Sequence, residues 1–276
     1  MILKHDYFPH VIHALRSDFL TRGQTVNRGE WQGKTDERPQ LMVFEVHDVA
    51  FKVKLNLDQH AWQNDTQPNL PWAEDHFQER ISGKPLNPGE QYKNWPWYEQ
   101  GVEEHKETGE FSHTYMERFW PKWPIEMWDS ESVSWEPRPG IRYDYGDLDD
   151  LMKLLEKRPY TRQAYLPIYF PEDLTASSIG ERVPCTLGYH FQAMPKEGRA
   201  LLSSTYFMRS CDYFRYLRDD VYMAGRLLQH VATAVGMDVG FLTVHIANLH
   251  IFNGEVSRLR DEHEAETQRR IAGAFS

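Results

Sequence analysis

The residue of this 276-residue chain best suited to covalent chemistry is Cys185, which directly follows Pro184. A thiolate at this position could attack an electrophilic carbon, and neighbouring cationic side chains would lower the pKa of the thiol. The alternative is a buried and inert thiol, the ordinary state of a lone cysteine in a reducing compartment. Cys185 alone does not distinguish the two.

A second group with chemical potential is the run Arg209, Ser210, Cys211 and Asp212, which follows a predicted strand. A guanidinium group beside a hydroxyl group suits a phosphate, because the arginine forms bidentate charge-assisted bonds and the serine adds a neutral one. The alternative is a surface ion pair between Arg209 and Asp212.

Arg162, four residues after Arg158, could also reach an anion, or it could belong to a solvated basic edge. His245 and His250 lie on one predicted strand, and their spacing of five predicts that they face opposite sides of it. A metal ion shared by these two is therefore not expected. The other His, Asp and Glu positions lack recognisable metal-ligand spacing, so the sequence predicts no metal site.

The elements that must position these residues show both helical and strand patterns. Apolar spacing predicts helices over 8–20, 147–157 and 220–235, with a shorter one from Trp72 to Gly83. Strand-like runs cover 41–55, 164–170, 187–194, 201–209 and 240–252, with a turn at 195–198 and turns or a hairpin within 21–40. The segment 60–145 is rich in Pro and Trp. This mixture predicts an α+β fold and a single domain over 1–276.

Composition excludes several classes of protein. The formal charge of −10 argues against broad electrostatic binding to nucleic acid. An apolar fraction of 40% excludes disorder, and a mean hydropathy of −0.67 without long apolar runs excludes a membrane span. Two cysteines, and an N-terminus without the apolar stretch of a signal peptide, predict a reducing, cytoplasmic setting.

Taken in order along the chain, these groups resemble the thymidylate synthase family and its phage relatives, the deoxycytidylate hydroxymethylases. Asp220 lies eleven residues after Arg209 and thirty before His250, separations that fit the family, whereas Cys185 and Arg209 are slightly farther apart than usual. The resemblance is good over 147–255 and weak before 110. It implies a thymidylate synthase-like fold, with a mixed sheet packed against helices and a homodimer joined sheet to sheet.

The resemblance implies catalytic roles for three residues. Cys185 would add to C6 of a pyrimidine nucleotide, so that C5 can take a one-carbon unit from 5,10-methylenetetrahydrofolate. Tyr115 would lie beside this nucleophile. A glutamate on an early helix would relay protons as general acid and base. Glu74, with Phe77 three residues later, fits that glutamate best, and Glu79 is the alternative.

It also implies a cradle for the 5′-phosphate. Arg209 and Ser210 would bind it directly, Arg162 would reach it from the partner subunit, and Arg28 would join from the N-terminal region. The family has two consecutive arginines at this point. Arg162 matches the first of them, but Gln163 takes the place of the second, so one positive charge is missing.

The sugar and the folate have implied contacts as well. His250 would contact the sugar, but Phe252 replaces the family's tyrosine, which removes one hydroxyl donor and leaves the choice between ribose and deoxyribose open. Asp212 matches the carboxylate that contacts the pterin of the folate.

Asp220 occupies the position that reads the base. Synthases have an asparagine there, whose amide matches uracil, whereas a carboxyl group can accept from N4–H of cytosine and, when protonated, donate to N3. The alternative is that Asp219 or Asp220 is a helix N-cap. Thr186 and His190 replace the synthases' histidine and glutamine after the nucleophile, and Thr186 matches the hydroxymethylases.

The sequence therefore predicts a cytoplasmic, phage-type or cellular enzyme that hydroxymethylates dCMP, with thymidylate synthase (dUMP to dTMP) as the alternative. A methylating deoxycytidylate enzyme lies between them. Outside the family, a cysteine hydrolase using Cys185 with His190 or His250 stays open, as does a non-catalytic binding module built on the Trp-rich segment 95–135. Neither a membrane nor a nucleic acid is an expected partner.

Overall fold

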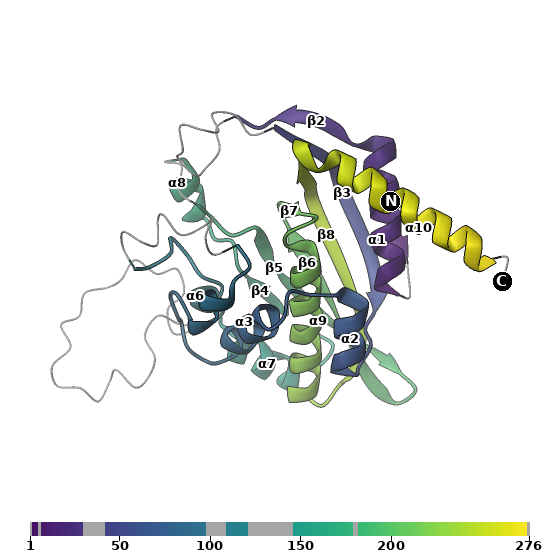
Figure 1. Ribbon diagram of the computed structural model, residues 1–276. Helices are drawn as coiled ribbons and strands as arrows, with labels where there is room; N and C mark the ends of the chain where they lie inside the picture. The colour runs from purple at the N-terminus through teal and green to yellow at the C-terminus, as the bar shows by residue number, and fades with distance from the viewer. Residues whose placement is uncertain are drawn as a thin grey trace.

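A computed structural model describes residues 2–4, 7–29, 42–97, 109–120, 146–178 and 182–274. In Figure 1 these residues form one mixed sheet with helices packed against it. The strands are β1 (Ile2–Lys4), β2 (Gln24–Asn27), β3 (Met42–Lys54), β4 (Tyr165–Pro167), β5 (Thr186–Lys196), β6 (Arg199–Met208), β7 (Cys211–Asp212) and β8 (Asp238–Phe252). Their order is β1-β3-β8-β6-β5-β4, with β2 paired to β3 and β7 to β8.

The helices lie between and after the strands. They are α1 (Phe8–Arg22), α2 (Gln59–Thr66), α3 (Trp72–Arg80), α6 (Met116–Phe119), α7 (Leu148–Lys157), α8 (Asp173–Ser178), α9 (Leu217–Ala234) and α10 (Val256–Ala274), with 3-10 turns η1 (Glu90–Asn94) and η3 (Asn253–Glu255). The side chains of Asp58 and Asp147 cap α2 and α7 by accepting from backbone N–H groups one turn later. Across the described ranges, no helix combines the length and the apolar character of a membrane span.

The central strand β8 joins the two halves of the sheet. It runs antiparallel to β3 and parallel to β6, and β6 forms an antiparallel hairpin with β5. Glu197 and Gly198 make the hairpin turn, both with positive φ (50° and 80°), which suits the twist of a tight hairpin. The register pairs Thr186 with Met208. Cys185, just before β5, and Arg209, just after β6, therefore lie opposite each other at one edge of the sheet.

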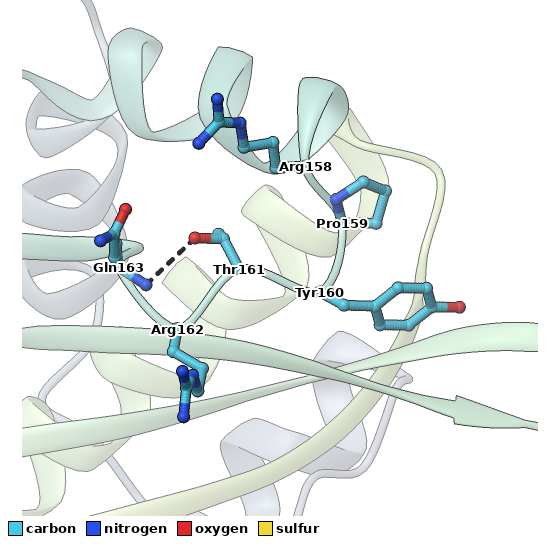
Figure 2. A pocket seen from close by; sticks show the side chains of 6 residues that line it. All are labelled: Arg158, Pro159, Tyr160, Thr161, Arg162 and Gln163. Atoms are coloured by element: carbon cyan, nitrogen blue, oxygen red, sulfur yellow. Dashed lines mark hydrogen bonds between the residues drawn. The ribbon is translucent and has the colours of Figure 1, made fainter.

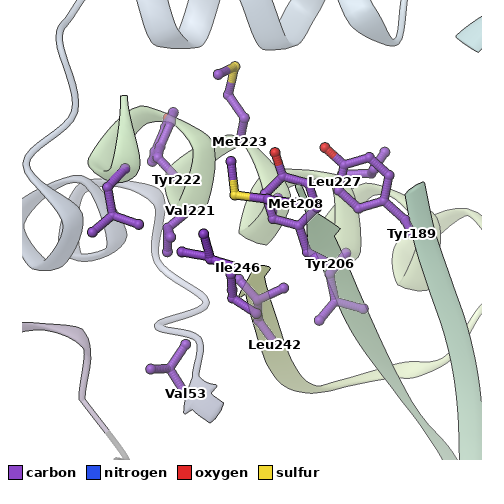
Figure 3. Packing of buried hydrophobic residues seen from close by; sticks show 14 of the residues in the cluster. Val53, Tyr189, Tyr206, Met208, Val221, Tyr222, Met223, Leu227, Leu242 and Ile246 are labelled. Carbon is purple, nitrogen blue, oxygen red and sulfur yellow. The ribbon is translucent and has the colours of Figure 1, made fainter. Parts of the chain in front are cut away.

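One face of the sheet is buried under α1 and α9. Phe8 and Phe19 of α1 pack against Phe51 and Phe44 of β3, with ring centroids 6.2 Å apart in both pairs. Apolar residues of α9 pack over β6 and β8 (Figure 3): Val221, Met223 and Leu227 against Tyr206, Met208, Leu242 and Ile246. Burying each such side chain contributes about 1.5–3 kcal/mol, so this layer holds the start of α9 firmly against the sheet.

On the opposite face, alternate side chains of the central strands are half-exposed. They include Thr205 and Phe207 of β6 and Thr243 and His245 of β8. In the described part of the chain, the helices therefore cover the sheet mainly on one side.

The alternation in β8 changes phase between Ile246 and Leu249. The change lies beside Asp48 of β3, which has a φ of 54° and is skipped in the ladder. His245 and His250 are therefore both on the half-exposed face. The prediction that they face opposite sides is wrong, because a spacing rule assumes an uninterrupted strand.

The α+β pattern predicted from the sequence is confirmed. The helices expected over 8–20, 147–157 and 220–235 are α1, α7 and α9, and the five strand-like runs correspond to β3, β4, β5, β6 and β8. The sequence did not predict α10, and α9 begins three residues earlier than expected. Residues 98–108 and 121–145, which include most of the Trp-rich segment 95–135, lie outside the described residues.

Candidate active site

Cys185 lies immediately before β5, beside the point where β6 ends. The backbone N–H of Arg209 donates to the carbonyl oxygen of Cys185 at 2.9 Å, which continues the β5–β6 ladder by one step. Cys185 is a free cysteine and is half-buried as a residue, whereas Cys211 is buried. The hairpin thus brings together the two motifs that the sequence analysis singled out.

The guanidinium group of Arg209 holds the segment that leads to the thiol. Its Nε donates to the carbonyl oxygen of Pro184 at 2.8 Å, and its Nη2 donates to that of Val183 at 2.9 Å. Its Nη1 has no hydrogen-bond partner in the described part of the chain, so it can bind an anion. The alternative ion pair with Asp212 is wrong, because Asp212 pairs with Arg215 at 2.7 Å.

The thiol of Cys185 lies among charges of both signs. Burial raises its pKa, Arg209 and Arg182 lower it, and Asp220 raises it further. The net direction is upward, so the thiol favours the protonated form unless a base removes its proton. Arg182 was not singled out from the sequence; its backbone carbonyl accepts a bond from Ser112 at 3.1 Å.

Asp220 lies in the first turn of α9 and contributes a carboxyl group to the same cluster. The N-cap of α9 is Tyr216, so the alternative that Asp219 or Asp220 is the N-cap is wrong. The thiol of Cys211 lies 3.9 Å from its Oδ2. Burial raises the pKa of Asp220 to about 7, while Arg80 lowers it and Asp219 raises it. Near neutral pH this carboxyl group can therefore either hold or release a proton.

A chain of hydroxyl groups begins next to Cys185. Thr186 donates to the hydroxyl of Tyr115 at 3.2 Å, and its Oγ1 lies 2.8 Å from the hydroxyl of Tyr206. Tyr206 stacks on Tyr189 with ring centroids 4.6 Å apart. Burial raises the pKa of Tyr115, which keeps the phenol neutral. Tyr115 is thus brought to the residue that follows Cys185.

Ser210 and His250 meet at the same edge of the sheet. The Oγ of Ser210 lies 3.2 Å from Nδ1 of His250, which in turn lies 3.2 Å from Oδ1 of Asn248. Burial lowers the pKa of His250, which favours a neutral imidazole at pH 7. The pair can offer hydroxyl and imidazole contacts to a sugar or a phosphate.

Asp212 shapes the turn that leads into α9. Its Oδ1 accepts from the backbone N–H groups of Phe214 (3.0 Å) and Arg215 (3.1 Å), and its Oδ2 accepts from Nη1 of Arg215 at 2.7 Å. Arg215 also lies over the ring of Phe252, 4.1 Å from its centroid. One lone pair of Oδ2 remains for a further donor.

Arg28 follows β2, where it binds Glu45 of β3. Its Nε donates to Oε2 at 2.9 Å, its Nη2 donates to Oε1, and His47 donates to the same carboxylate at 2.6 Å. Burial acts to raise the pKa of Glu45, but hydrogen bonds from Arg28, Asn248 and His47 lower it to about 2. Glu45 is the ladder partner of His250, so Arg28 is held near the His250 edge.

Arg162 is not brought to this cluster within one chain. The loop 158–163 borders an open pocket of about 490 Å³, and in Figure 2 the side chains of Arg158 and Arg162 extend to different sides of the loop. The side chain of Arg162 is exposed, and its carbonyl oxygen lies 3.1 Å from Nε2 of His190.

The carboxylates of Glu74 and Glu79 are both bound by other groups of the chain. The carboxylate of Glu74 accepts from the hydroxyl of Tyr222 and from Nη2 of Arg226 (3.0 Å). At about 100° per residue, positions 222 and 226 lie on the side of α9 away from Asp220. Glu79 accepts from two backbone N–H groups at the start of η1, at 2.7 and 3.1 Å.

The face of α3 that is turned toward the site carries His76 and Arg80, which the sequence analysis missed. Nη2 of Arg80 donates to Nε2 of His76 at 2.9 Å, and the guanidinium group lies 4.0 Å from the ring centroid of Tyr115. A signal was present in the sequence. Trp72, Ala73 and Phe77 mark the inner face of this helix, and positions 76 and 80 fall on that face whereas 74 does not.

The fold thus brings Cys185, Arg209, Ser210, Asp220 and His250 to one edge of the sheet, with Tyr115 beside Thr186 and with Arg28 and Asp212 at the rim. Such a set can combine a nucleophile, an anion-binding guanidinium group and a carboxyl group near its titration point. Among the described residues, no group of three or more His, Cys, Asp and Glu side chains is arranged to hold a metal ion.

Comparison with known proteins finds a family model and several relatives. Residues 58–272 match the family model described as thymidylate synthase. The chain is 28% identical over 144 residues to a "Putative thymidylate synthase" of Methanothermobacter thermautotrophicus, an alignment that covers 49% of this chain and 61% of that protein. A "Putative thymidylate synthase" of Methanopyrus kandleri is 28% identical over 127 residues, covering 44% of this chain and 59% of that protein.

A bacterial relative is more distant. The "Thymidylate synthase" of Listeria monocytogenes is 23% identical over 128 residues, covering 46% of this chain and 38% of that protein. The chain spans about three fifths of the length of the two archaeal relatives. Because the family model covers most of the chain, including every residue from Tyr115 to His250 in the cluster, the protein belongs to the thymidylate synthase family.

Proposed function

We propose that this protein transfers a one-carbon unit to C5 of a pyrimidine deoxynucleoside monophosphate, and that its substrate is dCMP, which it hydroxymethylates. The observation that supports the proposal is the cluster at the β5–β6 edge, where the charges of both Arg209 and Asp220 act on the Cys185 thiol. A nucleophile, an anion site and a base-reading carboxyl group within one cluster are the parts that such a transfer needs.

Arg209 would bind the 5′-phosphate through its free Nη1, with Ser210 beside it. Its other two nitrogens hold the carbonyl groups of Val183 and Pro184, so phosphate binding and the position of Cys185 are coupled. Because this guanidinium group lowers the pKa of the thiol, it also favours the thiolate that attacks C6.

Asp220 supports cytosine as the base. When the carboxyl group is protonated, it can donate to N3 of cytosine while its other oxygen accepts from the N4 amino group. Its pKa of about 7 makes the protonated form accessible at neutral pH. An ionised Asp220 facing uracil would instead repel the O4 lone pairs and leave a polar group unpaired, at a cost of about 1–3 kcal/mol.

Asp212 fits the pterin of 5,10-methylenetetrahydrofolate in one respect, because one lone pair of its buried Oδ2 remains free. When bound, this folate supplies the one-carbon unit. Asp212 would accept from pterin N–H groups, and Arg215 over Phe252 would give that side of the site a flat, cationic wall. The acid and base role of Glu74 stays a prediction, since its carboxylate is bound by Tyr222 and Arg226.

The direct test is to incubate the protein with dCMP or dUMP and methylenetetrahydrofolate and to identify the product by mass. We expect hydroxymethyl-dCMP, with dCMP preferred to dUMP by about tenfold or more. The Asp220→Asn variant should shift the preference toward dUMP. A wild-type protein that prefers dUMP would instead favour thymidylate synthase activity, the activity that the names of the relatives suggest.

The nucleophile has its own test. Cys185→Ser should abolish both turnover and exchange of the C5 hydrogen, because neither can occur without the C6 adduct. Cys211→Ser is the matched control, because Cys211 is the other cysteine of the chain and is buried. It should keep most activity. C5 exchange in the Cys185 variant would rule out the proposed chemistry.

We also propose that the protein is a homodimer joined through the half-exposed face of the sheet, with Arg162 completing the phosphate site of the partner. The exposure of Arg162 and of alternate side chains in β6 and β8 supports this. A mixture of Arg162→Ala and Cys185→Ala proteins should regain activity, since one site of each heterodimer would be intact. If subunits exchange and no activity returns, the shared site is refuted.

A further inference from the structure

Arg80, the last residue of α3, is a buried cation that the proposed chemistry does not yet use. Its side chain is 3% exposed, and Nη2 donates to His76 at 2.9 Å. Its Nε has no hydrogen-bond partner in the described part of the chain, and the same is true of Nδ1 of His76. Arg80 takes part in none of the ion pairs found among the described residues.

A guanidinium group in this state is costly. Moving an ion out of water costs several kcal/mol unless an opposite charge compensates for it. His76 cannot supply that charge, because an imidazole is neutral or cationic. Burial and Arg80 hold its pKa well below 6.5, so it is neutral here. The ring of Tyr115, 4.0 Å away, offers only a cation–π contact, which does not replace an opposite charge. The surroundings of Arg80 are therefore suited to receiving a negative charge that forms during the reaction.

The carboxyl group of Asp220 is the source of that charge. Arg80 reaches the site through Tyr115, because its guanidinium group lies over that ring and the Tyr115 hydroxyl accepts from Thr186, the residue after Cys185. After burial, Arg80 has the largest effect on the pKa of Asp220, and it favours the ionised form. Six other groups interact electrostatically with Asp220. They are Asp219 of α9, Cys211 of β7, Cys185 before β5, Tyr115 before α6, and Tyr189 and Tyr206 of β5 and β6. Asp219, when ionised, opposes ionisation of Asp220, and the tyrosines are neutral, so Arg80 is the cation of this set.

We propose that Arg80 is a positioning residue for Asp220, whose unpaired guanidinium group stabilises the carboxylate that remains when Asp220 gives its proton to the base. The identity of the base rests on the proposed function, whereas the effect of Arg80 on Asp220 does not.

With cytosine as the base, the attack of Cys185 on C6 is accompanied by proton transfer from Asp220 to N3. The Cys185 thiolate forms a bond to C6, the C5=C6 electron pair moves to C4=C5, and the C4=N3 pair becomes a lone pair on N3. N3 takes the proton of Asp220, and the O–H electron pair stays on the carboxylate. The negative charge thus moves from sulfur to Asp220, next to Arg80. A neutral side chain at position 80 would leave this charge buried without compensation.

The first test needs no nucleotide. Infrared titration of the full-length protein, with Asp220→Asn used to identify the band, reports the ionisation of the Asp220 carboxyl group. The midpoint should lie near pH 7 in the wild type. Arg80→Met should raise it by about one pH unit or more, and Arg80→Lys should keep it close to the wild-type value.

Asp219→Asn is the control, because removing a neighbouring negative charge should lower the midpoint instead. Arg80→Gln replaces Arg80→Met if the latter does not fold. If neither neutral variant folds while Arg80→Lys does, the guanidinium group is a requirement of the fold and the proposal is refuted. A folded neutral variant with an unchanged midpoint also refutes it.

The second test separates this inference from the proposed function. With dCMP, Arg80→Met should lower kcat and move the pH profile upward by the same amount as the infrared midpoint, with a much smaller change in KM. If the midpoint moves but neither dCMP nor dUMP reacts, the proposed function fails and the role of Arg80 stands. If dCMP reacts normally and the midpoint does not move, the function stands and the role of Arg80 fails.

Discussion

Two buried arginines of this protein have nearly the same exposure but opposite surroundings. Arg118 of α6 is 5% exposed and Arg80 of α3 is 3% exposed. Arg118 donates to both carboxylate oxygens of Asp173, at 2.8 and 2.9 Å, and to the carbonyl oxygen of Ile168. Arg80 has a neutral histidine and an aromatic ring. The difference separates a charge that holds elements together from one that is available to the site.

Other ion pairs fall between these extremes. Glu45 is buried and is bound by both Arg28 and His47, whereas Glu74 and Arg226 are each about one fifth exposed. If completeness of pairing reflects a structural role, replacing one partner should reduce stability most at Arg118, less at Glu45 and Glu74, and least at Arg80. The following four variants test this order.

Arg118→Met should have the largest effect. It leaves the Asp173 carboxylate buried without its partner, so the free energy of unfolding should fall by about 3–5 kcal/mol in denaturant titrations. The double variant Arg118→Met/Asp173→Leu should recover part of this loss, because it buries no isolated charge. A single variant as stable as the double one would show that the pair carries little structural weight.

Glu45→Gln tests a pH dependence. The folded-state pKa of Glu45, about 2, lies below its ordinary value of 4.5, so the ionised form adds stability that is present above pH 4.5 and lost as the pH falls toward 2. At 1.36 kcal/mol per unit, this shift of about 2.5 units amounts to about 3 kcal/mol. Urea titrations should show this loss in the variant at neutral pH and a much smaller difference from the wild type near pH 2.

Glu74→Gln should lower stability by about 1 kcal/mol, because its ion pair is partly exposed to water. Tyr222→Phe is the matched control, since it removes the other bond to the same carboxylate. The kinetics of Glu74→Gln then decide its role. Unchanged kcat, the outcome that its contacts favour, assigns the carboxylate to packing α3 against α9. A fall of about a hundredfold or more would establish the predicted acid and base role.

Arg80→Met should change the free energy of unfolding least, by about 1 kcal/mol or less in either direction. Arg80 takes part in no ion pair of the described residues, so its removal leaves no ion-pair partner buried without compensation. The measurement is the same denaturant titration as for Arg118→Met. A loss as large as that of Arg118→Met would show that Arg80 is part of the scaffold, and the contrast between the two arginines would disappear.

Much of the fold and site follows from local pattern. Helical spacing predicts α1, α7 and α9, and the β5–β6 hairpin follows from two strand-like runs around a Pro-Lys-Glu-Gly turn. The order and separation of Cys185, Arg209, Asp220 and His250 indicate the family before any contact is known. These features are readable because hydrogen bonding within an element and the burial of one face repeat at short, regular intervals.

Other features depend on contacts between residues far apart in the chain. Glu74 is turned to Tyr222 and Arg226 by the docking of α3 on α9, and Arg28 is bound by Glu45 through the pairing of β2 with β3. The phase change in β8 arises beside Asp48 of the neighbouring strand. Periodicity alone indicates which face of an element is buried. Only the tertiary structure determines which side chains lie opposite that face. It therefore also determines which charges form an ion pair and which, like the charge of Arg80, do not.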